Sequence, residues 1–299
     1  MTAISPPRPA APLSHLAGVA LVCVSAVVFS TAGIFTKAVD ANAWSVIFWR
    51  GAGAAILSMG FLMMRGGFRD EVSRFGGVAL LAAVVAASGT AAFIPAFKLT
   101  TVTNVVLIWA TAPFVAAALA WLLIGERPGL KIMLTSLLAL AGVGLTLRGS
   151  VGSGQLAGDL LALWMTLMMA AFYVIYRIWP GTPTVLPNVL ASVILLVPGW
   201  ILGGPMDTDG TEIGILLGFG LVFAVASITL TEGARRIPAA QTALLGALET
   251  PLAPLWAWLL LSELPTAWAV AGGMLVMVAV ILSQTTFRRH KKEGVSHGH

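Results

Sequence analysis

A single glutamate stands inside a long apolar stretch near the C-terminal end of the chain. The stretch runs from Gln241 to Pro265, QTALLGALETPLAPLWAWLLLSELP, and Glu249 lies near its middle. Helical steps of three and four residues place Gln241, Glu249 and Trp256 on one stripe, so polar and aromatic groups share a face. A charged side chain at the centre of a bilayer costs roughly 2.5–3.5 kcal/mol. Glu249 is therefore either a functional group, which would bind substrate or carry a proton, or a hydrogen-bond acceptor that holds neighbouring helices together.

Aromatic and polar side chains in other apolar stretches are candidates for a binding cavity. Trp109 and Trp164 lie within such stretches, where an indole N–H needs a hydrogen-bond partner or a cavity. Rings and nearby methionines suit planar ligands of varied shape, while lipid contact or core packing stays open for each ring. The predicted substrate-binding residues are Glu249, Trp109, Trp164, Tyr173, Phe93, Asn104, Thr111, Gln241 and Trp256.

Prolines and glycines within the apolar stretches indicate bends and close contacts. Pro95, Pro113, Pro251 and Pro254 are candidate hinges, because a proline frees a backbone carbonyl, and a fixed bend is the alternative. The spacing of Gly214 and Gly218 predicts close helix packing.

Three further charged residues are open to structural interpretations. Arg50 lies about six residues inside the second apolar stretch, where it can snorkel, pair with an acid or meet a substrate carboxylate. Glu126 and Glu263 each end an apolar stretch just before a proline. We expect each to interact with the positive end of the helix that follows.

The composition indicates a protein that crosses a membrane many times. Of the 299 residues, 58% are hydrophobic and 10% are charged, against about 25% charged residues in soluble domains. The net charge of +5 comes from basic residues in loops and the tail, which indicates membrane orientation and no nucleic-acid partner. The lone cysteine, Cys23, and four histidines outside the apolar stretches predict no metal site, and no P-loop or other cofactor motif is present.

Ten bilayer-length stretches predict an all-α protein with ten transmembrane helices. Thirteen basic residues fall on the side that carries both termini and three on the other, so the positive-inside rule predicts that both termini are cytoplasmic. The predicted spans are 16–37, 44–64, 76–97, 102–123, 131–148, 157–178, 185–203, 213–233, 240–261 and 267–286.

An internal repeat divides the predicted bundle into two halves. The stretch from Asn104 to Pro128 resembles that from Gln241 to Pro265, and Pro113, Trp121, Glu126 and Pro128 match Pro251, Trp258, Glu263 and Pro265. Five helices are an odd number, so the second half must lie inverted in the membrane, with a substrate site where the halves meet. The predicted units are a cytoplasmic tail at 1–15, repeats at 16–148 and 149–286, and a basic cytoplasmic tail at 287–299.

Each predicted five-helix repeat has a proline in its fourth helix and a closing AW-L-L-x-x-E-x-P pattern, at Ala120–Pro128 and Ala257–Pro265. In these features the sequence resembles the EamA-type drug/metabolite transporter superfamily. The sequence is also similar to the YddG-type branch, bacterial inner-membrane exporters of aromatic amino acids. This resemblance implies a central cavity lined by helices one, three, four, six, eight and nine, with helices five and ten at the periphery.

The expected function is secondary transport. We expect export of small amphipathic metabolites, foremost amino acids including aromatic ones, across the bacterial inner membrane by alternating access. Membrane lipids and a small-molecule substrate are the expected partners, and proton coupling is open. A multidrug or nucleotide-sugar carrier of the same fold is the alternative. An intramembrane enzyme is disfavoured because no paired acids or nucleophile sets lie at membrane depth.

Overall fold

The computed structural model describes residues 12–125, 128–179, 181–234, 236, 245–246 and 248–293, and the elements within these ranges are helices. The elements are α1 (Pro12–Ser30), α2 (Ala32–Lys37), α3 (Ala43–Met64), α4 (Phe68–Ser73), α5 (Gly77–Leu99), α6 (Val102–Trp109), α7 (Ala112–Ile124), α8 (Leu130–Ser150), α9 (Leu156–Ile178), α10 (Val185–Gly203), the 3-10 turn η1 (Pro205–Asp207), α11 (Gly210–Ala234), α13 (Glu249–Leu261) and α14 (Ala267–Glu293).

Eight helical segments of the described chain are long and apolar enough to cross a membrane. They agree with the first eight predicted spans to within about three residues, because bilayer thickness sets the length of each apolar run. The span predicted at 240–261 lies only partly within the described residues, and the span predicted at 267–286 lies in α14. The count of ten helices and the cytoplasmic position of both termini stay predictions.

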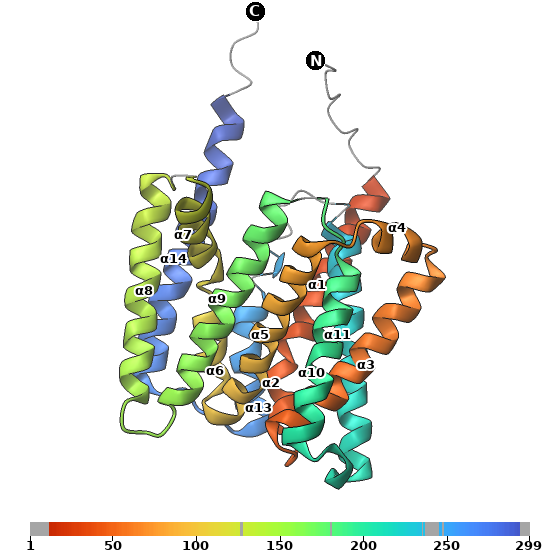
Figure 1. Ribbon diagram of the computed structural model, residues 1–299. Helices are drawn as coiled ribbons and strands as arrows, with labels where there is room; N and C mark the ends of the chain where they lie inside the picture. The colour runs from red at the N-terminus through yellow and green to blue at the C-terminus, as the bar shows by residue number, and fades with distance from the viewer. Residues whose placement is uncertain are drawn as a thin grey trace, which may run out of the picture.

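The long helices run alternately between two ends of the bundle (Figure 1). The start of α1 and the end of α14 lie at one end, which we call the terminal end, and the loops after α2, α5, α8, η1 and α13 lie at the opposite, distal end. The first helix of the first half, α1, begins at the terminal end, whereas α9 begins at the distal end. Corresponding helices of the two halves therefore run in opposite directions.

Helices α8 and α14 pack chiefly against each other at one side of the bundle (Figure 1). A Cβ atom on Gly142 of α8 would lie 2.6 Å from the carbonyl oxygen of Gly272 on α14, so the two backbones touch here. The outer faces of these and other helices expose leucine and methionine side chains. Such a surface is stable in lipid and not in water.

Two spans of the first half are each divided into two helices, and each of these spans lies within the described residues. The first span is divided at Thr31 between α1 and α2, and the fourth is divided between α6 and α7. Pro113 stands in the first turn of α7, where a proline needs no N–H partner. In the second half, α13 begins at Glu249. Pro95 and Pro254, two of the predicted hinges, lie inside the helices α5 and α13.

Glycines bring α3 and α11 close together near the centre of the bundle. A Cβ on Gly220 would overlap the carbonyl oxygen of Arg50, and a Cβ on Gly53 would lie 2.9 Å from the carbonyl oxygen of Leu217. The prediction of close packing at Gly214 and Gly218 is wrong, since neither position has a neighbour within 4 Å. The spacing of these two glycines resembles a packing motif, but their face points away from the other helices.

Candidate functional site

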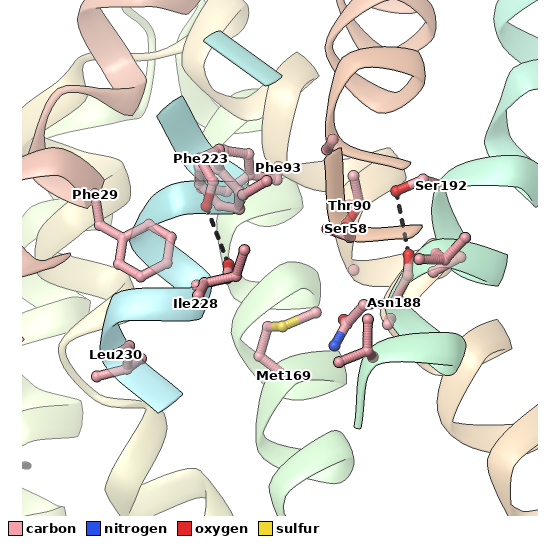
Figure 2. Close-up of a pocket in the computed structure, with 18 of the residues that line it drawn as sticks. Phe29, Ser58, Thr90, Phe93, Met169, Asn188, Ser192, Phe223, Ile228 and Leu230 are labelled. Atoms are coloured by element: carbon pink, nitrogen blue, oxygen red, sulfur yellow. Dashed lines mark hydrogen bonds between the residues drawn. The ribbon is translucent and has the colours of Figure 1, made fainter. Parts of the chain in front are cut away.

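A cavity of about 580 Å³ lies between the two halves of the bundle. Its wall contains residues of α1, α2, α3, α5 and α6 from the first half and of α9, α10, α11 and α13 from the second. In Figure 2, Phe29 and Phe223 lie on one side of the cavity, and Ser58, Asn188 and Ser192 lie on the other. The cavity thus offers an aromatic wall and a polar wall.

Two helices contribute to this wall although the resemblance did not imply them. The second and seventh spans, α3 and α10, supply Arg50, Ser58, Asn188 and Ser192. The expectation that six helices line the cavity was therefore too narrow. These helices reach the cavity because Gly51 and Gly199 allow α3 and α10 to pack closely, with a Cβ on Gly199 lying 3.0 Å from the Cβ of Phe48.

The cavity extends to the terminal end of the bundle. Its lining there includes Arg65, Glu71 and Glu232. Glu71 is buried and accepts hydrogen bonds from the backbone N–H groups of Val185 and Leu186, at 3.1 and 2.8 Å. It therefore satisfies the free amides at the first turn of α10 and joins α4 of the first half to the second.

At the distal end, carboxylates of the second half hold the first half in place. Glu263 accepts a hydrogen bond from the backbone N–H of Val102 at 2.8 Å and forms an ion pair with Lys37 at 3.2 Å. Glu212 accepts hydrogen bonds from the N–H groups of Asp40 and Ala41, at 2.5 and 3.2 Å. None of the residues in these contacts lines the cavity.

The prediction for Glu263 was therefore wrong in its partner. Glu263 stabilises the first turn of α6 in the other half, and not the helix that follows it, because the loop after α13 directs its side chain toward Val102. Ser262 makes that loop possible with a left-handed backbone, φ 54°. Glu126, the matching residue, lies outside the described residues.

Glu249 and Trp109 meet across the boundary between the two halves. The indole Nε1–H of Trp109 donates to Oε1 of Glu249 at 2.7 Å, and both side chains line the cavity. Trp109 is the last residue of α6 and Glu249 is the first residue of α13, so each lies at the end of a helix. The hydrogen bond to Trp109 uses only Oε1 of the carboxylate. The other oxygen, Oε2, can therefore accept a hydrogen bond from an ammonium group, or a proton, from the cavity.

The other predicted binding residues divide into two groups. Phe93 and Tyr173 line the cavity with Trp109 and Glu249. Trp164, Trp256, Asn104 and Thr111 do not appear in the lining. Gln241 lies outside the described residues.

Each residue of the second group has a partner elsewhere. The indole of Trp164 is half exposed on the outer side of the bundle and donates to Ser88 Oγ at 3.1 Å. Trp256 donates to Ser30 Oγ at 3.0 Å, and Ser30 itself lines the cavity. The hydroxyl of Thr111 donates to the carbonyl of Ile108 at 2.6 Å, at the break between α6 and α7.

A buried polar cluster near the distal end was not predicted from the sequence. Asp159 in the first turn of α9 is fully buried and accepts a hydrogen bond from Thr100 Oγ1 at 2.6 Å. Asn104 donates to both carboxylate oxygens of Asp159 at 3.2 Å and to Ser150 Oγ at 3.0 Å. Asn104 thus joins helices to each other and does not face the cavity. The signal in the sequence was Asp159 itself, an acid near the start of the apolar stretch predicted at 157–178.

Arg50 is buried in the cavity wall, where it lies against two aromatic rings. Its guanidinium carbon lies 5.0 Å from the ring centre of Phe223 and 5.5 Å from that of Phe219. Its Nε–H has no hydrogen-bond partner, and no ion pair joins Arg50 to a carboxylate among the described residues. Of the interpretations open from the sequence, snorkelling does not apply, because the side chain is 6% exposed and lies at the inner wall.

Comparisons with known proteins identify the fold. The model of the EamA-like transporter family matches residues 16–148 and 156–285. A crystal structure of a protein with 17% sequence identity superimposes with a TM-score of 0.61, over 96% of this chain and 99% of that one. At this identity the likeness concerns the fold alone. A search of curated proteins finds no match.

Proposed function

The chain belongs to the EamA-like transporter family, whose members are transporters and not enzymes, and from this premise we propose that it exports small amphipathic metabolites, foremost amino acids including aromatic ones. The membrane would be the bacterial inner membrane. The observation that carries the proposal is the cavity between the halves, in which the Glu249 carboxylate and the Trp109 indole are hydrogen-bonded at 2.7 Å.

The size and chemistry of the cavity support an amphipathic substrate. Its volume of about 580 Å³ lies within the usual range of roughly 300–1,000 Å³ for small-molecule sites. Phe29, Phe93 and Phe223 offer ring faces, and Glu249 offers an acceptor for a cationic group. An amino acid with a large apolar side chain combines both needs.

The two ends of the bundle support transport by alternating access. The cavity reaches the terminal end, while Glu263 and Glu212 hold the halves together at the distal end. If the terminal end is cytoplasmic, as the basic residues predict, this conformation loads substrate from the cytoplasm. Release would require the distal contacts to open, which gives the direction of export.

Glu249 has two candidate roles in this cycle. It would bind the ammonium group of the substrate, or it would carry a proton that exchanges with the substrate. In either role the negative charge is needed, so Glu249→Gln should lower transport while keeping the shape of the side chain. Trp109→Phe should lower transport as well, because it removes the N–H that positions the carboxylate.

The direct test is efflux of labelled phenylalanine from proteoliposomes, with and without a pH gradient. We expect Glu249→Gln to lower the rate by about tenfold or more, the value of a hydrogen bond to a charged group. Trp164→Phe is the matched control for Trp109→Phe, because Trp164 lies outside the cavity. No amino-acid flux in the wild-type protein, or equal flux in Glu249→Gln, would contradict the proposal.

A carrier of cationic amphipathic drugs is the second candidate. One acid among aromatic residues, as at Glu249, is also a suitable site for a lipophilic cation. Protection of cells against cationic dyes, with no amino-acid flux in proteoliposomes, would favour it. A nucleotide-sugar carrier would need several free cations in the wall, whereas Arg65 and Arg74 are paired with Glu232 and Asp70.

A further inference from the structure

Arg50 is held in the cavity wall by its position on α3 and by two phenylalanines of α11. Gly220 allows α11 to approach the backbone of Arg50, and Phe219 and Phe223 stand on either side of Gly220 in the same helix. Both rings lie within about 6 Å of the guanidinium carbon, the range of a cation–π contact. These contacts fix the guanidinium without using its N–H groups.

Burial of this cation is not balanced by any group of the described chain. Ring contacts only partly offset the cost of burying a charge that has no ionic or hydrogen-bonding partner. The N–H groups of a guanidinium lie in its plane, so ring contacts leave the need for an acceptor unmet. An arginine kept in this state has a role that packing does not explain.

Each acid among the described residues of the cavity wall has another contact, and none of them forms an ion pair with Arg50. Glu249 is bonded to Trp109, and Glu71 to the backbone of α10. The acids Asp70 and Glu232 are paired with Arg74 and with Arg65 and Arg236. Among the described residues no acceptor meets the Nε–H of Arg50, and a ligand in the cavity can supply one.

We propose that Arg50 binds the carboxylate of the transported substrate, so that the substrate class is metabolites with a free carboxylate next to an apolar or aromatic group. This inference rests on the proposed transport function. A guanidinium matches a carboxylate with two parallel hydrogen bonds. Phe223 contacts Arg50 and also the ring of Phe29, and the centres of the two phenylalanine rings are 4.7 Å apart. The apolar part of a ligand whose carboxylate binds Arg50 can therefore pack against these rings.

The charges in the wall favour a carboxylate over a phosphate ester. A phosphate carries nearly two negative charges at neutral pH. Arg50 supplies one positive charge, and the other lining arginines, Arg65 and Arg74, are already paired with acids near the terminal end. A single negative charge is what the site can neutralise.

The test measures ligand binding to the purified full-length protein in lipid nanodiscs. The probes are phenylpropionate, which has the carboxylate alone, phenethylamine, which has the amine alone, and phenylalanine, which has both. We expect Arg50→Gln to weaken phenylpropionate and phenylalanine binding by about tenfold or more, and phenethylamine binding by less than about twofold. Arg50→Lys should recover part of the loss, since it restores the charge but not the paired hydrogen bonds.

Arg65→Gln is the matched control. Arg65 lies on the same chain segment and lines the same cavity, but Glu232 neutralises it at 2.7 Å. This variant should not show the carboxylate-specific loss. Equal loss for all three probes in Arg50→Gln, or no loss for any, would overturn the proposal.

The wild-type protein provides an independent test if the variants do not fold. Phenylpropionate should compete with phenylalanine for the site, and phenethylamine should compete less well. Stronger competition by phenethylamine would overturn the inference about Arg50. Failure of the proposed function is distinguishable from this, because it appears as absent flux in proteoliposomes and not as a changed order of ligand binding.

Discussion

Replacing Glu263 by glutamine should open the distal end of the bundle more often. Glu263 of the second half holds the N–H of Val102 and the ammonium of Lys37 in the first half, at 2.8 and 3.2 Å. The hydrogen bond to a charged group contributes about 1.5–3 kcal/mol, and the partly exposed ion pair adds at most about 1 kcal/mol. Glutamine still accepts a neutral hydrogen bond worth about 1 kcal/mol, so the net loss is about 0.5–3 kcal/mol.

A loss of this size should raise the ratio of distal-open to distal-closed protein by about 2–150-fold. The assay is labelling of a cysteine at Thr36, which is fully buried in α2 beside Lys37. Because Cys23 is the only native cysteine, a Cys23→Ala background leaves Thr36→Cys as the single reactive site. A membrane-impermeant maleimide added at the distal side should label it faster, by the same factor, when Glu263→Gln is present.

Asp209→Asn is the matched control for this experiment. Asp209 is a carboxylate at the same end of the bundle, but it accepts a hydrogen bond from the backbone N–H of Thr211 in the first turn of α11, so its contact stays within the second half. It should leave the labelling rate unchanged. A Glu263→Gln protein labelled no faster than its parent would refute the view that this contact closes the distal end.

Three stability predictions follow from other contacts, each measured by thermal unfolding of the purified protein. Gly220→Ala should destabilise by about 1–3 kcal/mol, because its Cβ would meet the α3 backbone, while Gly218→Ala, with no neighbour within 4 Å, should not. Glu71→Ala should cost about 0.5–2 kcal/mol by removing the acceptor for the N–H groups at the start of α10. The comparison variant is Asp70→Ala, which should change the stability little because Asp70 is exposed. Asp159→Asn should cost about 1–3 kcal/mol, because the new NH2 group would replace an oxygen that accepts a hydrogen bond from Asn104 and would face that donor instead. An unchanged unfolding midpoint would contradict the role of this cluster.

The spans were predictable because the bilayer sets one length for every apolar run. Eight runs predicted from hydropathy agree with helices of the structure. The internal repeat also indicated where the halves meet, and Glu249 and Trp109 do meet there. Both features depend on local composition or on a pattern along the chain, and sequence carries these directly.

The direction in which each side chain faces was not predictable in the same way. Trp164 and Trp109 look equivalent in the sequence, yet Trp109 faces the cavity and Trp164 faces outward. The neighbours of a helix decide this, and in a membrane both faces are apolar, so periodicity gives little guidance. The contributions of α3 and α10 were missed for the same reason, since they depend on contacts such as that of Gly220 with Arg50.

The carboxylates that join the halves at the ends of the bundle bear on the speed of the transport cycle. Glu71, Glu212 and Glu263 each bind backbone N–H groups at the start of a helix or in a loop, near the ends where water can enter. When such a contact separates, water takes over both the amide and the carboxylate, so no helix needs to unwind and no polar group is left dry. In the alternating access that we propose, such contacts keep the energy barrier between the two conformations low, and we expect switching within the microsecond to millisecond times typical of domain motions.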